Sequence, residues 1–229
     1  MDDYIKNKAL EAQENSSEKY LFNVPIIILD SFINKINLDF VTKKIESLLP
    51  KTLFRNIEAI YIGNFDVLNS RGVNAAYTDG VIYLTNVQDD EADIIDDIVH
   101  EIAHAVEEMY GMHIYSDDRI ESEFIGKRKR LFDMLKAAGH TGASLSSFLN
   151  PEYSREFDEF LYQEVGYPAL VNYCSGLFLS PYAITSIREY FARGFEHYFL
   201  KNDKKYLIKL CPQLYYKIDQ MFDSINSGE

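Results

Sequence analysis

The sequence predicts an α+β fold that is mostly helical and contains one small antiparallel β-sheet. The first observation is a run of short apolar and alternating segments in the first half of the chain, the second is a strong hairpin signal at Asp79-Gly80, and the third is helical periodicity through most of the second half. A small sheet followed by helices is typical of the α+β class. With 229 residues, 47% of them hydrophobic, the chain is long enough to bury a substantial core.

The predicted sheet comes from segments whose side chains alternate or are continuously apolar. Asp79 and Gly80 both tolerate the positive φ of a tight turn, so the segments on either side of them should pair as a hairpin. A helix with apolar residues at three- and four-residue steps should precede these strands and end at Pro50. Strands are expected at residues 24–29, 57–62, 74–77 and 81–85, and the helix at residues 37–49.

After Asp89 and Asp90, which are good helix N-caps, the pattern becomes helical and remains so. The basic run Lys127-Arg128-Lys129-Arg130 lies inside one of these patterns, where we interpret it as the solvated face of a helix. Helices are expected at residues 117–138, 155–165, 186–200 and 210–222, and a loop at residues 139–150.

Composition predicts the class of partner and the compartment. A net charge of −13 opposes general binding to nucleic acid, because phosphate backbones attract basic surfaces. Because no signal peptide is recognisable and no apolar stretch approaches the roughly 20 residues of a membrane span, we expect a cytoplasmic protein without membrane contact. Cys174 and Cys211 match no metal spacing and should be buried thiols. Residues 1–20 should form a polar N-terminal segment, and residues 21–229 one domain.

The segment from Ile98 to Gly111 contains the sequence HExxH. On a helix, His100 and His104 lie one turn apart on the same face, so both imidazoles can reach one ion. Glu101 is placed to take a proton from a metal-activated water without binding the metal itself. The opposite face should anchor the helix through apolar residues at helical spacing, namely Ile95, Ile98, Val99, Ile102, Val106 and Met109.

Two aspartates, Asp93 and Asp97, precede the histidines on the same helix face. They could orient a ligand histidine, or they could complement the positive helix N-terminus. A catalytic zinc site also needs a third protein ligand. Glu123 follows His104 at the HExxH-x18-E spacing, whereas Glu189 and Glu196 lie much further along the chain.

A resemblance favours Glu189. The segment from Ser180-Pro181-Tyr182 to Glu189-Tyr190-Phe191-Ala192 resembles the catalytic region of the anthrax lethal factor family, which also includes the Pro-Pro endopeptidases. In that family the glutamate that opens an E-[FY]-F-A motif binds zinc together with the two HExxH histidines. A tyrosine seven residues earlier hydrogen-bonds the substrate oxygen. The resemblance implies that His100, His104 and Glu189 bind Zn²⁺ and that Glu101 and Tyr182 are catalytic.

The same resemblance implies a zincin-like metallopeptidase domain of the gluzincin type, with the sheet next to the HExxH helix. The hairpin strand at residues 81–85 resembles the edge strand that lines the cleft of zincins, and would hold an extended peptide. The similarity covers residues 57–111 and 179–200, so residues 112–177 would be an inserted helical region. Ala103 and Arg193 stand where the family often has glycine and glutamate, and the long insertion leaves Glu123 open as the third ligand.

The function predicted from these residues is a zinc-dependent endopeptidase that acts on a peptide or protein substrate. The alternative is a catalytically inactive metallopeptidase fold that serves as a binding module. His113 and His140 could also bind a metal, but their surroundings favour exposed loop histidines.

Overall fold

The computed structural model describes residues 19–201 and 203–227, and the described residues form two compact units that divide between Met109 and Tyr110. Residues 1–18 of the predicted polar segment lie outside the described part, and residues 19 and 20 belong to a strand. The single domain at residues 21–229 and the insertion at residues 112–177 remain predictions.

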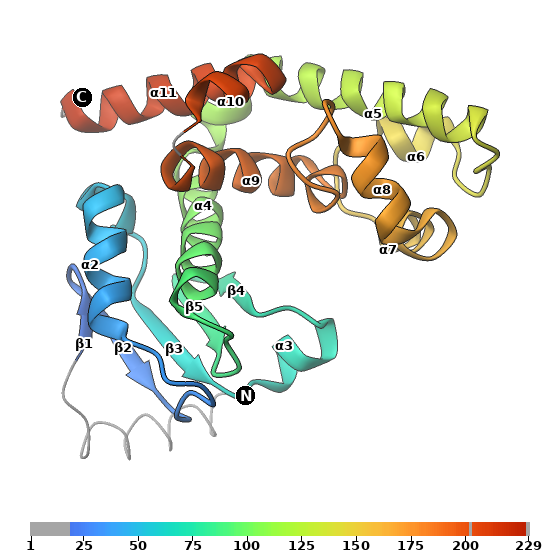
Figure 1. Ribbon diagram of the computed structural model, residues 1–229. Helices are drawn as coiled ribbons and strands as arrows, with labels where there is room; N and C mark the ends of the chain where they lie inside the picture. The colour runs from blue at the N-terminus through green and yellow to red at the C-terminus, as the bar shows by residue number, and fades with distance from the viewer. Residues whose placement is uncertain (1–18, 202, 228–229) are drawn as a thin grey trace. The chain divides into compact units, whose positions relative to one another are not determined.

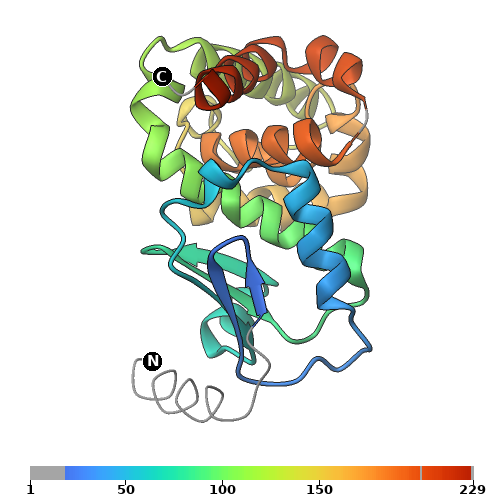
Figure 2. The same cartoon turned by 90° about the vertical axis from the view of Figure 1, so that its left-hand side faces the viewer.

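The first unit contains a five-stranded sheet in the order β1-β2-β3-β5-β4 (Figure 1). Figure 2 shows its β1–β2 hairpin, drawn in blue, beside the helix α2. The strands and shorter helices of this unit are β1 (Lys19–Leu21), β2 (Val24–Ile28), α2 (Leu38–Leu48), the 3₁₀ helix η1 (Lys51–Phe54), β3 (Ala59–Gly63), α3 (Asp66–Arg71), β4 (Ala75–Thr78) and β5 (Val81–Thr85).

The predicted antiparallel sheet is wrong, because the sheet is mixed. β1–β2 and β4–β5 are antiparallel hairpin pairs, whereas β2–β3 and β3–β5 are parallel. The parallel pairs follow from the connections: α2 lies between β2 and β3, and between β3 and β5 the chain runs back along β4, so it returns to the same end of the sheet before β3 and before β5. The turn itself is as predicted, with Asp79 at φ 49° and Gly80 at φ 82°.

The two central strands bury side chains on both faces. Ile60, Ile62, Ile82 and Leu84 alternate along β3 and β5 and are completely buried. On the other face, the rings of Tyr61 and Tyr83 stack at 6.0 Å, next to a small apolar cluster built from α3, β4 and the residue that precedes α3. Burial on both faces fixes the register of these strands, because a shift by one residue would exchange the two faces.

The HExxH helix is α4 (Glu91–Tyr115). Asp90 caps it, because its Oδ1 accepts hydrogen bonds from the backbone N–H groups of Ala92 (2.8 Å) and Asp93 (3.1 Å). The predicted apolar face is confirmed except at its end: Ile95, Ile98, Val99, Ile102 and Val106 are buried, whereas Met109 is half-buried. α4 is therefore held by its apolar side, which leaves the histidine side for chemistry.

The second unit is helical and is built around the long helix α5, with α6 and α8 packed against it and α11 packed against both α5 and α9 (Figure 1). The predicted helices are confirmed with shifted ends, and α6, α8 and α10 were not predicted. The elements are α5 (Arg119–Ala137), α6 (Leu145–Leu149), α7 (Arg155–Glu159), the π-helix η2 (Phe160–Gly166), α8 (Tyr167–Cys174), the 3₁₀ turn η3 (Tyr182–Ile184), α9 (Ile187–Leu200), α10 (Lys204–Leu210) and α11 (Pro212–Ser227).

The basic run on α5 is not a solvated face throughout. Lys127 is buried, and its Nζ donates to the backbone carbonyls of Leu177 (2.8 Å) and Leu210 (2.6 Å). Arg128 is completely buried and donates to two backbone carbonyls in or beside α6. Only the other two basic residues are exposed. The pattern misled because both cations donate hydrogen bonds to carbonyl groups of other segments, which no local periodicity reveals.

Both cysteines, Cys174 and Cys211, are free and buried, as predicted. Burial raises the pKa of the Cys174 thiol to about 12, so this thiol is protonated at neutral pH. Within residues 19–201 and 203–227, no helix has the length and apolar character that a membrane crossing requires.

Candidate metal centre

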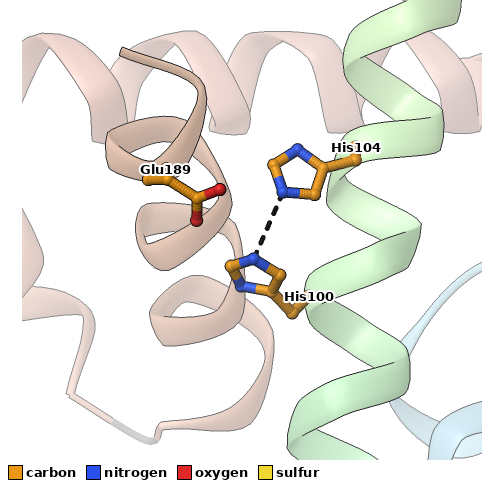
Figure 3. Close-up of side chains that lie close together, drawn as sticks. All are labelled: His100, His104 and Glu189. Carbon is orange, nitrogen blue, oxygen red and sulfur yellow. Dashed lines mark hydrogen bonds between the residues drawn. The ribbon is translucent and has the colours of Figure 1, made fainter. Parts of the chain in front are cut away.

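The two histidines of α4 point at one position. The Nε2 atoms of His100 and His104 lie 3.2 Å apart (Figure 3). Ligand atoms about 2.0–2.1 Å from a tetrahedral zinc ion would be roughly 3.3 Å from each other. His104 is buried and His100 is half-buried. The first imidazole is therefore enclosed by protein, whereas the second remains partly exposed to solvent.

Glu189 is the third member of the group. Its carboxylate and the nitrogens of His100 and His104 all lie within 4.8 Å of one another, and the three residues could hold a metal ion (Figure 3). Glu189 is in the first turn of α9, whose N-cap Ser186 accepts a hydrogen bond from the Glu189 N–H at 3.2 Å. The cap fixes where this turn begins and thereby the direction of the Glu189 side chain.

Glu123, the rival third ligand, has a different role. Its carboxylate accepts the Tyr190 hydroxyl at 2.7 Å and the backbone N–H groups of Gln213 (2.9 Å) and Leu214 (3.4 Å). The last two bonds satisfy donors in the first turn of α11, which have no partner within their own helix. Glu123 therefore joins α5, α9 and α11 within the second unit.

Glu196, the other glutamate considered, is also engaged. It is buried and accepts a hydrogen bond from Arg193 Nη1 at 2.8 Å. Neither it nor Glu123 belongs to the group of ligand atoms formed by the two histidines and Glu189.

The base predicted in HExxH is held by a strand. Glu101 is buried, and its Oε2 accepts the backbone N–H of Tyr77 on β4 at 2.6 Å. The Tyr77 hydroxyl donates to Glu108 on the same helix at 2.5 Å. Burial, followed by this hydrogen bond, raises the pKa of Tyr77 to about 12. The two bonds tie β4 to α4 at the residue beside His100.

Within the hairpin the edge strand is β4 and not β5, which corrects the sequence prediction for residues 81–85. β5 pairs with β3 on one side and β4 on the other, so both of its backbone edges are used. Among the described residues β4 pairs only with β5. The sequence prediction for β5 came from its resemblance to the edge strand of zincins, whereas its apolar character fits its position between β3 and β4.

Glu107 supports His104. The Nδ1 atom of His104 lies 3.4 Å from Glu107 Oε2, and the Glu107 carboxylate is buried. A carboxylate on one ring nitrogen orients the other nitrogen toward a metal. The sequence carried a signal for this contact, because Glu107 follows His104 by three residues on a helix.

Asp97, one helical turn before Glu101, accepts a hydrogen bond from Gln88 Nε2 at 3.1 Å. Burial raises the pKa of Asp97 to about 6, the Gln88 bond opposes this shift, and the charge of Glu101 adds to it. Asp93 is exposed near the helix N-terminus. Of the two aspartates, Asp97 is therefore the one that belongs to the buried polar surroundings of the histidines.

Tyr182 begins the 3₁₀ turn η3, immediately before α9, and its side chain is partly accessible at 38% residue exposure. The guanidinium carbon of Arg193 lies 5.6 Å from the centre of its ring. His113 and His140 are not part of the metal group; His113 lies in the last turn of α4, which corrects its placement in a loop.

The elements that shape this centre are a capped helix with a histidine pair, a strand that holds the intervening glutamate, and a second capped helix with a carboxylate. The contact of Tyr77 with Glu101 had no signal in the sequence, because a backbone N–H carries no residue identity. Comparisons of the chain with protein-family models, curated proteins and solved structures found no match.

Proposed function

We propose that the protein is a zinc-dependent endopeptidase of the zincin type, in which His100, His104 and Glu189 bind the metal. The observation that carries the proposal is the group of three ligand atoms within 4.8 Å, with Glu101 on the same helix as the histidines. The resemblance of the HExxH and E-[FY]-F-A segments to the lethal factor family supports the same set.

The donor set fits zinc. Two imidazoles and one carboxylate are a common catalytic zinc arrangement, and three protein ligands leave a fourth position for water or substrate. Glu107 would keep the Nδ1 side of His104 engaged and so direct Nε2 at the ion. No cysteine lies in the group, which distinguishes it from the thiolate sets typical of structural zinc sites.

The residues divide the reaction between them. When bound, the zinc ion would act as a Lewis acid on the scissile carbonyl and make water acidic near neutral pH. Glu101 would accept the proton of the attacking water and deliver it to the leaving amine. Tyr77 would keep one Glu101 oxygen in place through its backbone N–H, so that the other oxygen carries the proton.

Tyr182 and β4 would act on the substrate. The Tyr182 hydroxyl would donate a hydrogen bond to the oxygen on which negative charge develops, and one such donor is typically worth about 3 kcal/mol. β4, an edge strand of the sheet, would bind an extended peptide by strand addition through the outward backbone groups that Glu101 does not occupy. Backbone pairing supplies affinity without regard to sequence, which suits an endopeptidase.

The decisive variant is Glu101→Gln, because its amide oxygen can still accept from Tyr77 while its proton affinity is lost. We expect peptide cleavage to fall by about 10²–10⁴-fold, with zinc content unchanged. Glu108→Gln is the matched control, since Glu108 is exposed on the same helix. Cleavage that survives in Glu101→Gln would refute the scheme. A zinc-loaded wild type that binds peptides without cutting them would favour the binding-module alternative.

A further inference from the structure

Arg193 stands where the related family often has a glutamate, and its contacts lie within the second unit. Its guanidinium carbon is 5.6 Å from the ring centre of Tyr182, and its Nη1 donates to Glu196 Oε2 at 2.8 Å. Because Glu196 is buried, the ion pair fixes the guanidinium on α9 more firmly than a surface pair would. The cation is thus held against a tyrosine ring.

The backbone of Tyr182 is held independently. Its carbonyl oxygen accepts the Thr185 hydroxyl at 2.9 Å and the Thr185 N–H at 3.0 Å. These bonds fix the main chain at the start of η3 and do not involve the ring, whose orientation depends on rotation about its side-chain bonds. The guanidinium is therefore a contact that can restrict the ring itself.

The same helix face carries the proposed third ligand. Glu189 and Arg193 are four residues apart on α9, so their side chains project one above the other. Tyr182 precedes this helix by a single turn and an N-cap. The local structure of one unit thereby brings together a ligand, a phenol and a cation.

The Nε–H of Arg193 is buried and makes no hydrogen bond among the described residues. A buried donor without an acceptor costs stability. The Nε–H therefore does not hold the Arg193 side chain in place, whereas the Glu196 ion pair and the Tyr182 ring contact do.

We propose that Arg193 is a positioning residue for Tyr182: its guanidinium holds the phenol in the orientation that meets the substrate oxygen, and its charge makes the hydroxyl a stronger donor. This inference rests on the proposed peptidase function. A guanidinium over an aromatic face is attractive and pre-organises the ring. A phenol that is already oriented loses less entropy when negative charge develops in front of it.

The first test uses metal-free protein with ¹³C-labelled tyrosine rings. Tyr182→Phe identifies the Tyr182 signal, which is then compared in wild type, Arg193→Gln and Arg193→Lys. We expect the signal to shift toward the value of an exposed, freely rotating tyrosine in Arg193→Gln. In Arg193→Lys it should move only part of the way, because lysine keeps the charge but lacks the planar group. An unchanged Tyr182 signal in Arg193→Gln would overturn the proposal.

The second test is a double-mutant cycle on zinc-loaded protein. Arg193→Gln should lower kcat about fivefold with KM within about twofold of wild type, and Arg193→Lys should recover part of the loss. In a Tyr182→Phe background, Arg193→Gln should cause no further decrease in kcat. Arg188→Gln, at the other arginine of α9, is the control and should leave kcat unchanged.

The positioning role would be contradicted if Arg193→Gln still lowered kcat in the Tyr182→Phe background, or if it raised KM and not kcat. Either result would show that Arg193 acts on the substrate. If the wild type cleaves no peptide, the proposed function fails. The tyrosine signals then still decide whether Arg193 orients Tyr182.

Discussion

The backbone N–H of Tyr77 donates to the carboxylate of Glu101 at 2.6 Å, and this bond joins the edge strand β4 to the histidine helix. It gives one strand two tasks in the proposed enzyme, because β4 both pairs with the substrate and orients the base. Tyr77→Pro tests the second task, since proline removes the N–H and is tolerated on edge strands where that group is outside the ladder. Tyr77→Ala is the control, because it retains the N–H.

We expect kcat in Tyr77→Pro to be on the order of tenfold below that in Tyr77→Ala, because a misplaced base loses its alignment with the proton. The zinc content of both variants should equal that of wild type. Equal kcat values in the two variants would mean that the bond does not position Glu101.

Substitutions of Glu189 and Glu123 should have different effects, the first on zinc binding and the second on the stability of the fold. Glu189→Gln should weaken zinc binding at least about tenfold and leave the free energy of unfolding of the metal-free protein nearly unchanged. Glu123→Gln should retain zinc but lower that free energy by about 1–3 kcal/mol, because one of its bonds to Tyr190 and the α11 N–H groups is lost. Metal analysis and urea unfolding measure both quantities, and loss of zinc in Glu123→Gln would reverse the assignment.

Substitution of Glu107 should lower the zinc affinity more than substitution of the neighbouring Glu108 does. Glu107→Gln weakens the contact with His104 Nδ1, and the loss of such a partner typically costs about 10–100-fold in metal affinity. Glu108→Gln, at a carboxylate that accepts the Tyr77 hydroxyl, should leave the zinc affinity unchanged. Competition with a chelator of known zinc affinity gives the comparison, and equal affinities would remove Glu107 from the centre.

The raised pKa of Asp97 implies that the free energy of unfolding of the metal-free protein depends on pH. Burial raises the pKa of Asp97 to about 6 in the fold, against the usual 3.8 of an aspartate, so between these pH values the folded state binds a proton that the unfolded state has released. Its contribution to stability is complete below about pH 4 and is lost as the pH rises through about 6. The difference in unfolding free energy between wild type and Asp97→Asn should therefore change by about 1–3 kcal/mol across this interval. A difference that is flat with pH would contradict the buried setting of Asp97.

Local sequence patterns were enough to predict most helices and strands and part of the candidate metal centre. The apolar face of α4, the Asp79-Gly80 turn and the helix that carries Glu189 each depend on neighbours in sequence, and each lies where the pattern indicated. The helical spacing of His100 and His104 likewise sets their separation without help from distant segments.

What the sequence missed depends on contacts between distant segments. The parallel pairing of β3 with β5 needs a crossover whose path no periodicity encodes. Glu123 matched a ligand spacing, yet its carboxylate is used by the N-terminus of α11, about ninety residues later. The sequence pattern placed Lys127 on the surface, but its ammonium group is buried and donates hydrogen bonds to carbonyls of two other segments. The third ligand could be named only through a resemblance, because its distance in sequence from the histidines carries no geometric information.

The most direct test of the account is cleavage of a mixed peptide library by purified full-length protein, before and after metal removal. We expect internal peptide bonds to be cut, the activity to vanish with a zinc chelator, and one equivalent of Zn²⁺ to restore it. Protein that carries a full equivalent of zinc and leaves every peptide intact, or that cuts equally well without metal, would contradict the proposed metallopeptidase.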